Sequence, residues 1–216
     1  MRVTNASHPE TGYPAPRHSA SALSGGQMAK VIRTVRLSLV PLTPALGTAD
    51  LAGRDALARE LGAEVPDGWP PELFERDKLE WTIRHLEQHP REIGWWLHYI
   101  LFRPEDRLVG VAGFKGPPDA NGLIEVGYSI LSAFRRRGIA TEATLGLADH
   151  VFARKDVHCI IAQTLQSYSA SRTVLEKAGF HYAGAGSEPD IICYELARGD
   201  WEAARRRCER APDAVV

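Results

Sequence analysis

The chain has 216 residues, of which 44% are apolar and 25% are charged, and its formal net charge is −1. This length suits one well-buried domain, and the composition excludes a wholly disordered chain. The balanced charge excludes a global attraction to nucleic acid or to an anionic membrane, so any anion site must be local.

The N-terminal residues 1–28 are rich in Pro, Ser, Gly, His and Ala and follow no periodic apolar pattern. Such a segment cannot bury enough apolar surface to offset the entropy lost on ordering. We therefore expect a disordered tail over residues 1–28, one domain over residues 29–201 and a C-terminal tail over residues 202–216. Because Met28 directly precedes the first patterned segment, the translation start stays open between Met1 and Met28.

The first half of the domain contains a strand, two helices and then a hairpin. Residues 31–39 alternate apolar and polar side chains, which predicts a half-buried strand that ends before Pro41. Apolar residues at helical spacing then predict helices over residues 49–61 and 71–88, the second stopped by Pro90. The hairpin strands cover residues 95–102 and 108–115, and a further strand covers residues 123–131.

The second half alternates helices and strands. A helix is expected directly after residues 135–138, because apolar residues recur at helical spacing as far as Phe152. The remaining elements are a strand over residues 159–165, a helix over residues 169–177, a strand over residues 190–196 and a possible short strand around Tyr182. The resulting order, β-α-α-β-β-β-α-β-α-β, indicates the α/β (α+β) class.

The cysteines bear on the compartment and on metal binding. Cys159, Cys193 and Cys208 form no CxxC pair and no Cys/His cluster, so we expect no metal. Their odd number argues against a complete intrachain disulfide framework and favours a reducing cytoplasm.

No stretch approaches the roughly 18 apolar residues that span a bilayer, and the N-terminus lacks the apolar core of a secretory signal. We therefore expect a cytoplasmic protein without membrane or nucleic-acid partners, as a monomer or a homodimer.

Three consecutive arginines, Arg135 to Arg137, lie between the predicted strand over residues 123–131 and the next helix. The first turn of a helix has unpaired N–H groups and a partial positive charge, which suit a phosphate. Gly138 lets a phosphate approach the backbone, Ala140 keeps the next position small, and the arginines can donate charge-assisted hydrogen bonds. The alternative is a solvated charge run, and no GxxxxGK[ST] loop is present.

Two segments resemble motifs of the GNAT superfamily of N-acetyltransferases. Arg135, Gly138 and Ala140 fill the fixed positions of (Gln/Arg)-x-x-Gly-x-(Gly/Ala), the pyrophosphate loop of motif A. Residues 170–180 are similar to the motif B helix and end in its Lys-x-Gly-Phe pattern. The resemblance spans about residues 33–201, and the order of the predicted elements agrees with it.

The resemblance implies a mixed, mostly antiparallel central sheet, splayed between its fourth and fifth strands and flanked by about four helices. The splay would fall between residues 123–131 and residues 159–165, and acetyl-CoA would lie in it. The residues assigned to acetyl-CoA in this way are Ile130 and Leu131 beside the pantetheine, Arg135, Arg136, Arg137, Gly138, Ile139, Ala140 and Thr141 around the pyrophosphate, and Ser171 on the motif B helix.

The resemblance also implies direct attack of an amine on the thioester. Glu125 precedes Val126-Gly127-Tyr128 and matches the Glu-(Ile/Val)-Gly-Tyr stretch of the ribosomal-protein alanine/serine N-acetyltransferase branch, where this glutamate is thought to act as a base. The alternative for Glu125 is a structural pair with an arginine. The position of the tyrosine that some GNAT enzymes use as an acid holds Leu175. Tyr168 or Ser169 is therefore the candidate proton donor, unless water protonates the leaving thiolate and Tyr168 only packs against pantetheine.

The acceptor pocket is less determined by the sequence. The first two helices, the hairpin and the last strands would build it, and they contain an aromatic set that otherwise belongs to the core. His98 and His85 are further candidate bases, and Asp190 is a candidate anchor for an ammonium group. The aromatic set is Trp69, Trp81, Trp95, Trp96 and Tyr99.

The sequence therefore predicts an acetyl-CoA-dependent N-acetyltransferase whose acceptor is a protein N-terminus or a small amine. One alternative is a GNAT-like module that binds acyl-CoA without turnover and serves as a sensor or scaffold. A second alternative is a phosphate-binding protein unrelated to CoA, which only the arginine cluster supports.

Overall fold

The computed structural model describes residues 30–210 of the chain. The predicted disordered tail over residues 1–28 and the choice of translation start lie outside these residues. At the other end, helix α6 (Arg198–Arg210) runs into the segment predicted as a C-terminal tail. The first part of that segment, up to Arg210, is therefore helical.

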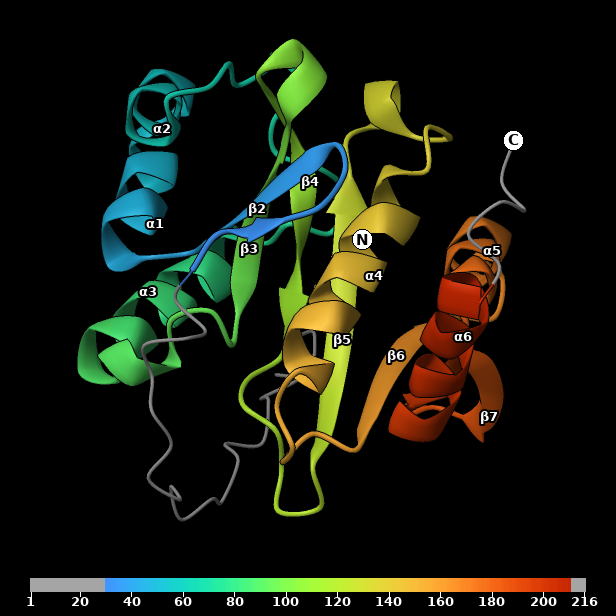
Figure 1. Ribbon diagram of the computed structural model, residues 1–216. Helices are drawn as coiled ribbons and strands as arrows, with labels where there is room; N and C mark the ends of the chain where they lie inside the picture. The colour runs from blue at the N-terminus through green and yellow to red at the C-terminus, as the bar shows by residue number, and fades with distance from the viewer. Residues whose placement is uncertain (1–29, 211–216) are drawn as a thin grey trace, which may run out of the picture.

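Eight strands of the described chain form one mixed sheet in the order β1-β2-β3-β4-β5-β6-β8-β7 (Figure 1). All neighbouring strands pair antiparallel except β5 and β6, which are parallel. The mostly antiparallel sheet expected from the sequence is confirmed. The strands are β1 (Ile32–Arg33), β2 (Leu37–Pro41), β3 (Leu97–Phe102), β4 (Arg107–Phe114), β5 (Leu123–Ile130), β6 (Cys159–Leu165), β7 (His181–Ala185) and β8 (Ile191–Ala197).

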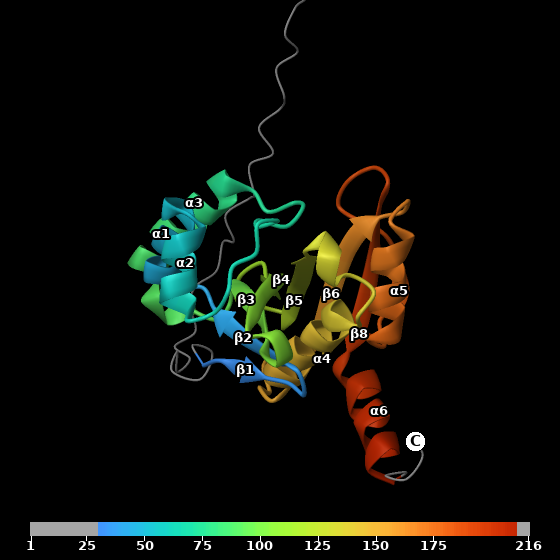
Figure 2. The same cartoon turned by 90° about the horizontal axis from the view of Figure 1, so that it is seen from above.

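The described residues form six α-helices rather than about four. Helices α1 to α3 gather beside one another and away from α4 and α5 (Figure 2). Adjacent strand residues point to opposite faces, and Tyr99 bonds to Asp50 of α1 on the face away from α4. Besides α6, the helices are α1 (Pro44–Ala52), α2 (Arg54–Leu61), α3 (Arg76–Gln88), α4 (Ile139–Phe152) and α5 (Ser169–Lys177).

Three of the predicted elements have other boundaries in the structure. The helix expected over residues 49–61 is two helices, because Gly53 has a φ of 121° that a continuous helix does not allow. The first of them begins earlier, at Pro44, where the hydroxyl of Thr43 accepts the N–H of Leu46. The strand expected over residues 31–39 is divided into β1 and β2 by a turn, and the helix expected from residue 71 begins at Arg76.

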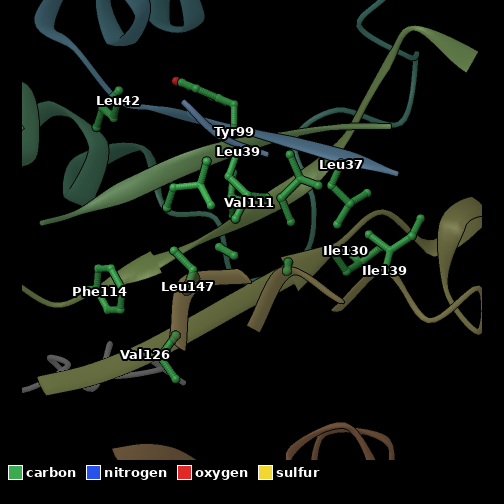
Figure 3. Packing of buried hydrophobic residues seen from close by; sticks show 14 of the residues in the cluster. Leu37, Leu39, Leu42, Tyr99, Val111, Phe114, Val126, Ile130, Ile139 and Leu147 are labelled. Atoms are coloured by element: carbon green, nitrogen blue, oxygen red, sulfur yellow. The ribbon is translucent and has the colours of Figure 1, made fainter. Parts of the chain in front are cut away.

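The core between the sheet and α4 is continuous (Figure 3). Ile139 and Leu147 of α4 lie against Ile130 of β5 and the leucines of β2. Side chains of this kind contribute about 1.5 to 3 kcal/mol each when they are fully buried. This packing fixes the start of α4 relative to the end of β5. No helix in the described part of the chain is long and apolar enough to cross a membrane.

The turn between β1 and β2 is fastened to the first turns of α4. Glu142 accepts hydrogen bonds from the Thr34 hydroxyl at 2.6 Å, from the Arg36 backbone N–H at 2.7 Å and from Arg36 Nε at 2.7 Å. A Cβ at Gly146 would lie 2.6 Å from Cγ2 of Thr34, so only glycine allows this approach. The guanidinium of Arg103 holds the carbonyl groups of the same turn.

We predict that Glu142→Gln lowers the free energy of unfolding at pH 7 by about 1 to 3 kcal/mol, as for charged hydrogen bonds. Burial acts to raise the pKa of Glu142, but the bonds from Thr34 and Arg36 outweigh it and the net pKa is lowered. The stabilisation is therefore present above the pKa of the unfolded carboxyl group and is lost as the pH falls through the folded pKa. Urea titrations at pH 7 and pH 3.5 measure the difference in the free energy of unfolding between the wild type and Glu142→Gln.

The matched control is Glu80→Gln, which breaks an exposed pair with Arg76 on α3. Such pairs contribute roughly 0.5 kcal/mol or less. If Glu142→Gln is as stable as the control variant at pH 7, the attachment of the β1–β2 turn to α4 does not depend on this carboxylate.

Candidate functional site

Strands β5 and β6 separate in the middle of the sheet. They pair at Leu123, Ile124 and Glu125 of β5, and within the described residues no later pairing joins them. Beyond that point β5 stays bonded to β4 as far as Ile130, and β6 stays bonded to β8 as far as Leu165. The splay predicted between residues 123–131 and 159–165 is confirmed.

The backbone of β5 turns alternate residues toward this gap. The N–H of Leu131 donates to Val109 at 3.0 Å and the carbonyl of Glu125 accepts from Lys115 at 3.0 Å, so odd-numbered residues bond to β4. The N–H and C=O groups of the even-numbered residues Tyr128 and Ile130 therefore face the gap.

Ile130 and Leu131 differ in which of their backbone hydrogen-bonding groups are free to bond to a ligand in the gap. The Ile130 carbonyl accepts a hydrogen bond from Arg135 Nε at 3.0 Å, which leaves its N–H toward the gap. The Leu131 carbonyl accepts the N–H of Phe134, and the Leu131 N–H bonds to β4 as described above. Of this predicted pair, Ile130 is thus the residue that presents a backbone donor to the gap.

The loop from β5 to α4 is shaped as a cradle for an anion. Arg136 has a φ of 63° and Gly138, which caps α4, has a φ of 75°. The first N–H that bonds back onto the helix start belongs to Glu142, which donates to the Gly138 carbonyl at 3.0 Å. The N–H groups of Ile139, Ala140 and Thr141 therefore have no acceptor inside the helix, and such groups suit phosphate oxygens.

The three arginines of this loop have different surroundings. Arg135 pairs with Glu72 at 2.9 Å, and Arg137 pairs with Glu105 at 2.8 Å while its guanidinium lies 5.0 Å from the Phe134 ring centroid. Arg136 is exposed. Two of the three predicted cations are thus shared with carboxylates, although exposed pairs of this kind are weak and can exchange partners.

A fourth arginine, which sequence reasoning missed, borders the loop. Arg36 lies in the β1–β2 turn, and its Nη2 atom is 3.4 Å from the position that a Cβ of Gly138 would take. Its Nε atom is bonded to Glu142, so the guanidinium is held in this orientation. Because 102 positions separate Arg36 from Gly138 in the sequence (138 − 36), only the tertiary fold brings them together.

Residues on α5 face the other side of the gap. The Tyr128 hydroxyl donates to the Ser171 carbonyl at 3.1 Å and lies 3.1 Å from the Ser171 hydroxyl oxygen. Burial raises the pKa of Tyr128, with the bond to Ser171 acting in the opposite direction. Tyr168 directly precedes α5 and is 48% exposed, whereas Leu175 is buried in the core. Tyr128 is thus a second tyrosine near the predicted site, and its position was not foreseen.

Glu125 lies on the opposite face of the sheet from Tyr128. Its carboxylate pairs with Lys115, not with an arginine, and accepts a hydrogen bond from Gln163 Nε2 at 3.2 Å. The Gln163 side-chain oxygen in turn accepts the backbone N–H of Ser187 at 2.7 Å, which fixes the orientation of the amide. The Glu125 side chain is 16% exposed. The predicted base is therefore held by two donors and still reaches solvent.

The other candidate side chains divide between core and surface. Trp69 and Tyr99 are buried and donate hydrogen bonds to Asp50, whose pKa is raised by burial. His98 is fully buried and Trp95 is in the core, while Trp81 is 44% exposed. The His85 ring bonds to Glu92 at 2.7 Å. Trp96 packs against Trp81. The backbone carbonyl of Asp190 accepts the N–H of Gln166.

Comparisons with known proteins agree with this geometry. The sequence model of the acetyltransferase (GNAT) domain matches residues 36–181. An uncharacterized N-acetyltransferase of Bacillus subtilis, YjdG, is 31% identical over 152 residues, which cover 69% of this chain and 89% of that protein.

Solved structures show the same fold. The ribosomal-protein-S5-alanine acetyltransferase of Vibrio fischeri superposes with a TM-score of 0.56 at 17% identity, covering 80% of this chain and 98% of that chain. The ribosomal L7/L12 alpha-N-protein acetyltransferase RimL, solved in complex with coenzyme A, superposes with a TM-score of 0.54 at 18% identity, covering 78% and 98%.

We predict that His98 makes the stability of the protein sensitive to acid. Burial, with a smaller contribution from the neighbouring His150, lowers the pKa of His98 to about 3, so the unfolded chain binds a proton between about pH 6.5 and pH 3 that the folded chain does not. Stability should fall as the pH falls through this window, by about 1.4 kcal/mol per pH unit for one proton.

The measurement is urea unfolding of the wild type and of His98→Leu from pH 7 to pH 4. The variant should lose less stability on acidification than the wild type does. His181→Leu, at an exposed histidine of β7, is the matched control and should keep the wild-type slope. Equal slopes for wild type and His98→Leu would contradict the prediction.

Proposed function

The chain belongs to the GNAT family of N-acetyltransferases, and from this premise we propose that it transfers an acetyl group from acetyl-CoA directly to a primary amine. The acceptor is a protein N-terminus or a small-molecule amine. The observation that carries the proposal is the splay between β5 and β6, which opens beside a helix N-terminus whose first N–H groups have no acceptor inside the helix. The fold shared with two ribosomal-protein acetyltransferases, one of them solved with coenzyme A, supports the same function.

The residues of the gap fit coenzyme A. The N–H groups of Ile139, Ala140 and Thr141 would hold the pyrophosphate, with Gly138 leaving room for it. Arg136 would add positive charge and Arg36 would offset the carboxylate of Glu142, while Arg135 and Arg137 shape the loop through Ile130, Glu72 and Glu105. The Ile130 backbone and Ser171 would border the pantetheine. Bound acetyl-CoA would supply an activated acetyl thioester.

Glu125 receives the proton that the acceptor must lose. A peptide α-amine with a pKa of about 8 costs roughly 1.4 kcal/mol to deprotonate at pH 7, whereas a lysine amine at about 10.4 costs nearer 4.6 kcal/mol. A carboxylate that reaches solvent and is held by Gln163 and Lys115 can take this proton directly or through one water. The lower cost favours a peptide N-terminus as the acceptor.

Tyr168 returns a proton to the sulfur of the departing CoA. It stands at the start of α5 and is half exposed, so it can exchange its own proton with solvent. Tyr128 is the alternative donor, because its hydroxyl is held at Ser171 on the other side of the gap. A cytoplasmic site of action completes the proposal, since free thiols such as Cys159 and Cys193 persist in a reducing compartment.

We predict that acetyl-CoA raises the melting temperature of the protein and that Gly138→Asp weakens acetyl-CoA binding at least about tenfold, or about 1.4 kcal/mol. The new carboxylate would occupy the approach to the N–H groups and repel the pyrophosphate. Gly62→Asp is the matched control, because Gly62 caps α2 with a similar φ of 63°. A thermal shift assay measures the melting temperature, and isothermal titration calorimetry measures the acetyl-CoA affinity of the wild type and of both variants. No response of the wild type to acetyl-CoA would refute the function.

We predict that Glu125→Gln keeps acetyl-CoA affinity but lowers kcat by about a hundredfold, the lower end of general-base contributions. Thiol release with peptides that begin with Ala or Ser, with polyamines and with aminoglycosides measures turnover and names the acceptor. Glu87→Gln, on the exposed face of α3, is the control.

Tyr168→Phe and Tyr128→Phe belong in the same thiol-release assay. A lower kcat in Tyr168→Phe is expected, and a loss in Tyr128→Phe alone would transfer the donor role to Tyr128. If acetyl-CoA binds but no acceptor releases thiol, the protein is the non-catalytic acyl-CoA-binding module instead.

A further inference from the structure

We propose that the absence of a side chain at Gly127 leaves the space in which the acceptor amine binds, on the face of β5 that carries Glu125. The proposal rests on the proposed N-acetyltransferase function and assigns the acceptor side of the same site. Residues 125, 127 and 129 of β5 share one face of the sheet, because strand side chains alternate. This face is the one opposite α4 and α5.

Neither backbone conformation nor packing requires a glycine at position 127. Its φ lies outside the left-handed range that favours glycine, and a Cβ placed there meets no atom of the described residues 30–210 within 4 Å. The two glycines of the partner strand β4 differ in this respect. A Cβ at Gly113 would lie 2.1 Å from the Trp96 carbonyl oxygen, and one at Gly110 would lie 2.4 Å from that of Ser129. Those two glycines serve close packing, whereas Gly127 leaves open space.

The open space lies where the strands begin to separate. The last paired row of β5 and β6 joins Glu125 to Ile161, and Gly127 is two residues further along β5. With a rise of about 3.4 Å per residue, Gly127 is about 7 Å from Glu125 along the strand. This distance is within the combined reach of a glutamate side chain and one water molecule. A group above Gly127 thus stands beside both the gap and the base.

Two loops border the same space. On one side, the Ser129 hydroxyl donates to the Glu72 carbonyl at 2.5 Å and so ties the segment between α2 and α3 to β5. On the other, the β7–β8 loop reaches Glu125 through Ser187 and Gln163. The backbone of Gly127 is paired with Gly113 of β4. A group in this space would therefore contact the backbone of Gly127, and the negative charge beside it would come from the Glu125 carboxylate.

These features define the class of acceptor. The carboxylate of Glu125 attracts an ammonium group, and the space is that of an absent side chain. An amine on a carbon atom with little bulk fits, such as the N-terminal residue of a peptide that begins with Gly, Ala or Ser. A peptide that begins with Leu or Trp should be a poorer acceptor.

The test is a series of substitutions at Gly127. Gly127→Ala and Gly127→Val should fold with a near wild-type melting temperature and keep the wild-type Kd for acetyl-CoA. The kcat/KM for a peptide beginning with Ala should fall at least about tenfold in Gly127→Ala and further in Gly127→Val, since one methyl group in a fitted pocket changes rates by about 10- to 200-fold. Gly199→Val is the matched control, because a Cβ at Gly199 of α6 also meets no atom within 4 Å in the part of the chain that the structure describes.

Wild-type kcat/KM in Gly127→Val would overturn the proposal. An equal loss of acetyl-CoA affinity and of turnover would also overturn it, because the residue would then act on the donor side. If the wild type binds no acetyl-CoA, the proposed function fails first. The binding measurement therefore separates the two failures.

Discussion

The parallel pairing of β5 with β6 ends after Glu125 and Ile161, and the backbone groups further along β5 are left facing a gap. Backbone N–H and C=O groups inside a protein normally have partners, so a break in a central sheet demands either a ligand or water. The rest of the fold preserves this break. Strand β5 stays bonded to β4 on one side, β6 stays bonded to β8 on the other, and the Tyr128 side chain of β5 bonds to Ser171 of α5.

The position of α4 decides whether the gap becomes a phosphate site. Its apolar residues pack on β2 and β5. Glu142, near the start of α4, accepts hydrogen bonds from Thr34 and Arg36 of the β1–β2 turn. The same contact brings Arg36 beside Gly138. Glu142 alone would repel an anion at the helix start, and its pairing with Arg36 removes that obstacle. One ion pair thus fastens the sheet edge to the helix and leaves the N–H groups as a favourable place for phosphate.

The alternation of β5 divides the proposed chemistry between two faces. The even-numbered residues Tyr128 and Ile130 have their backbone groups in the gap where we propose the donor, and the Tyr128 side chain reaches α5. The odd-numbered residues Glu125 and Gly127 lie on the other face, where we propose the acceptor. In the proposed site both substrates therefore lie beside the same stretch of β5.

Local sequence patterns determined much of this protein. The strand Cys159–Leu165, the helix Ser169–Lys177 and the loop before α4 could be read directly, because periodicity, Gly138 and the arginines act over a few residues. The split helix at Gly53 was missed because one residue's φ interrupted an otherwise helical pattern. Only the tertiary structure brought Arg36 to Gly138, joined Gln163 to Glu125, and buried His98. Such contacts depend on strand order and register across the whole sheet, which the spacing of residues along the chain does not contain.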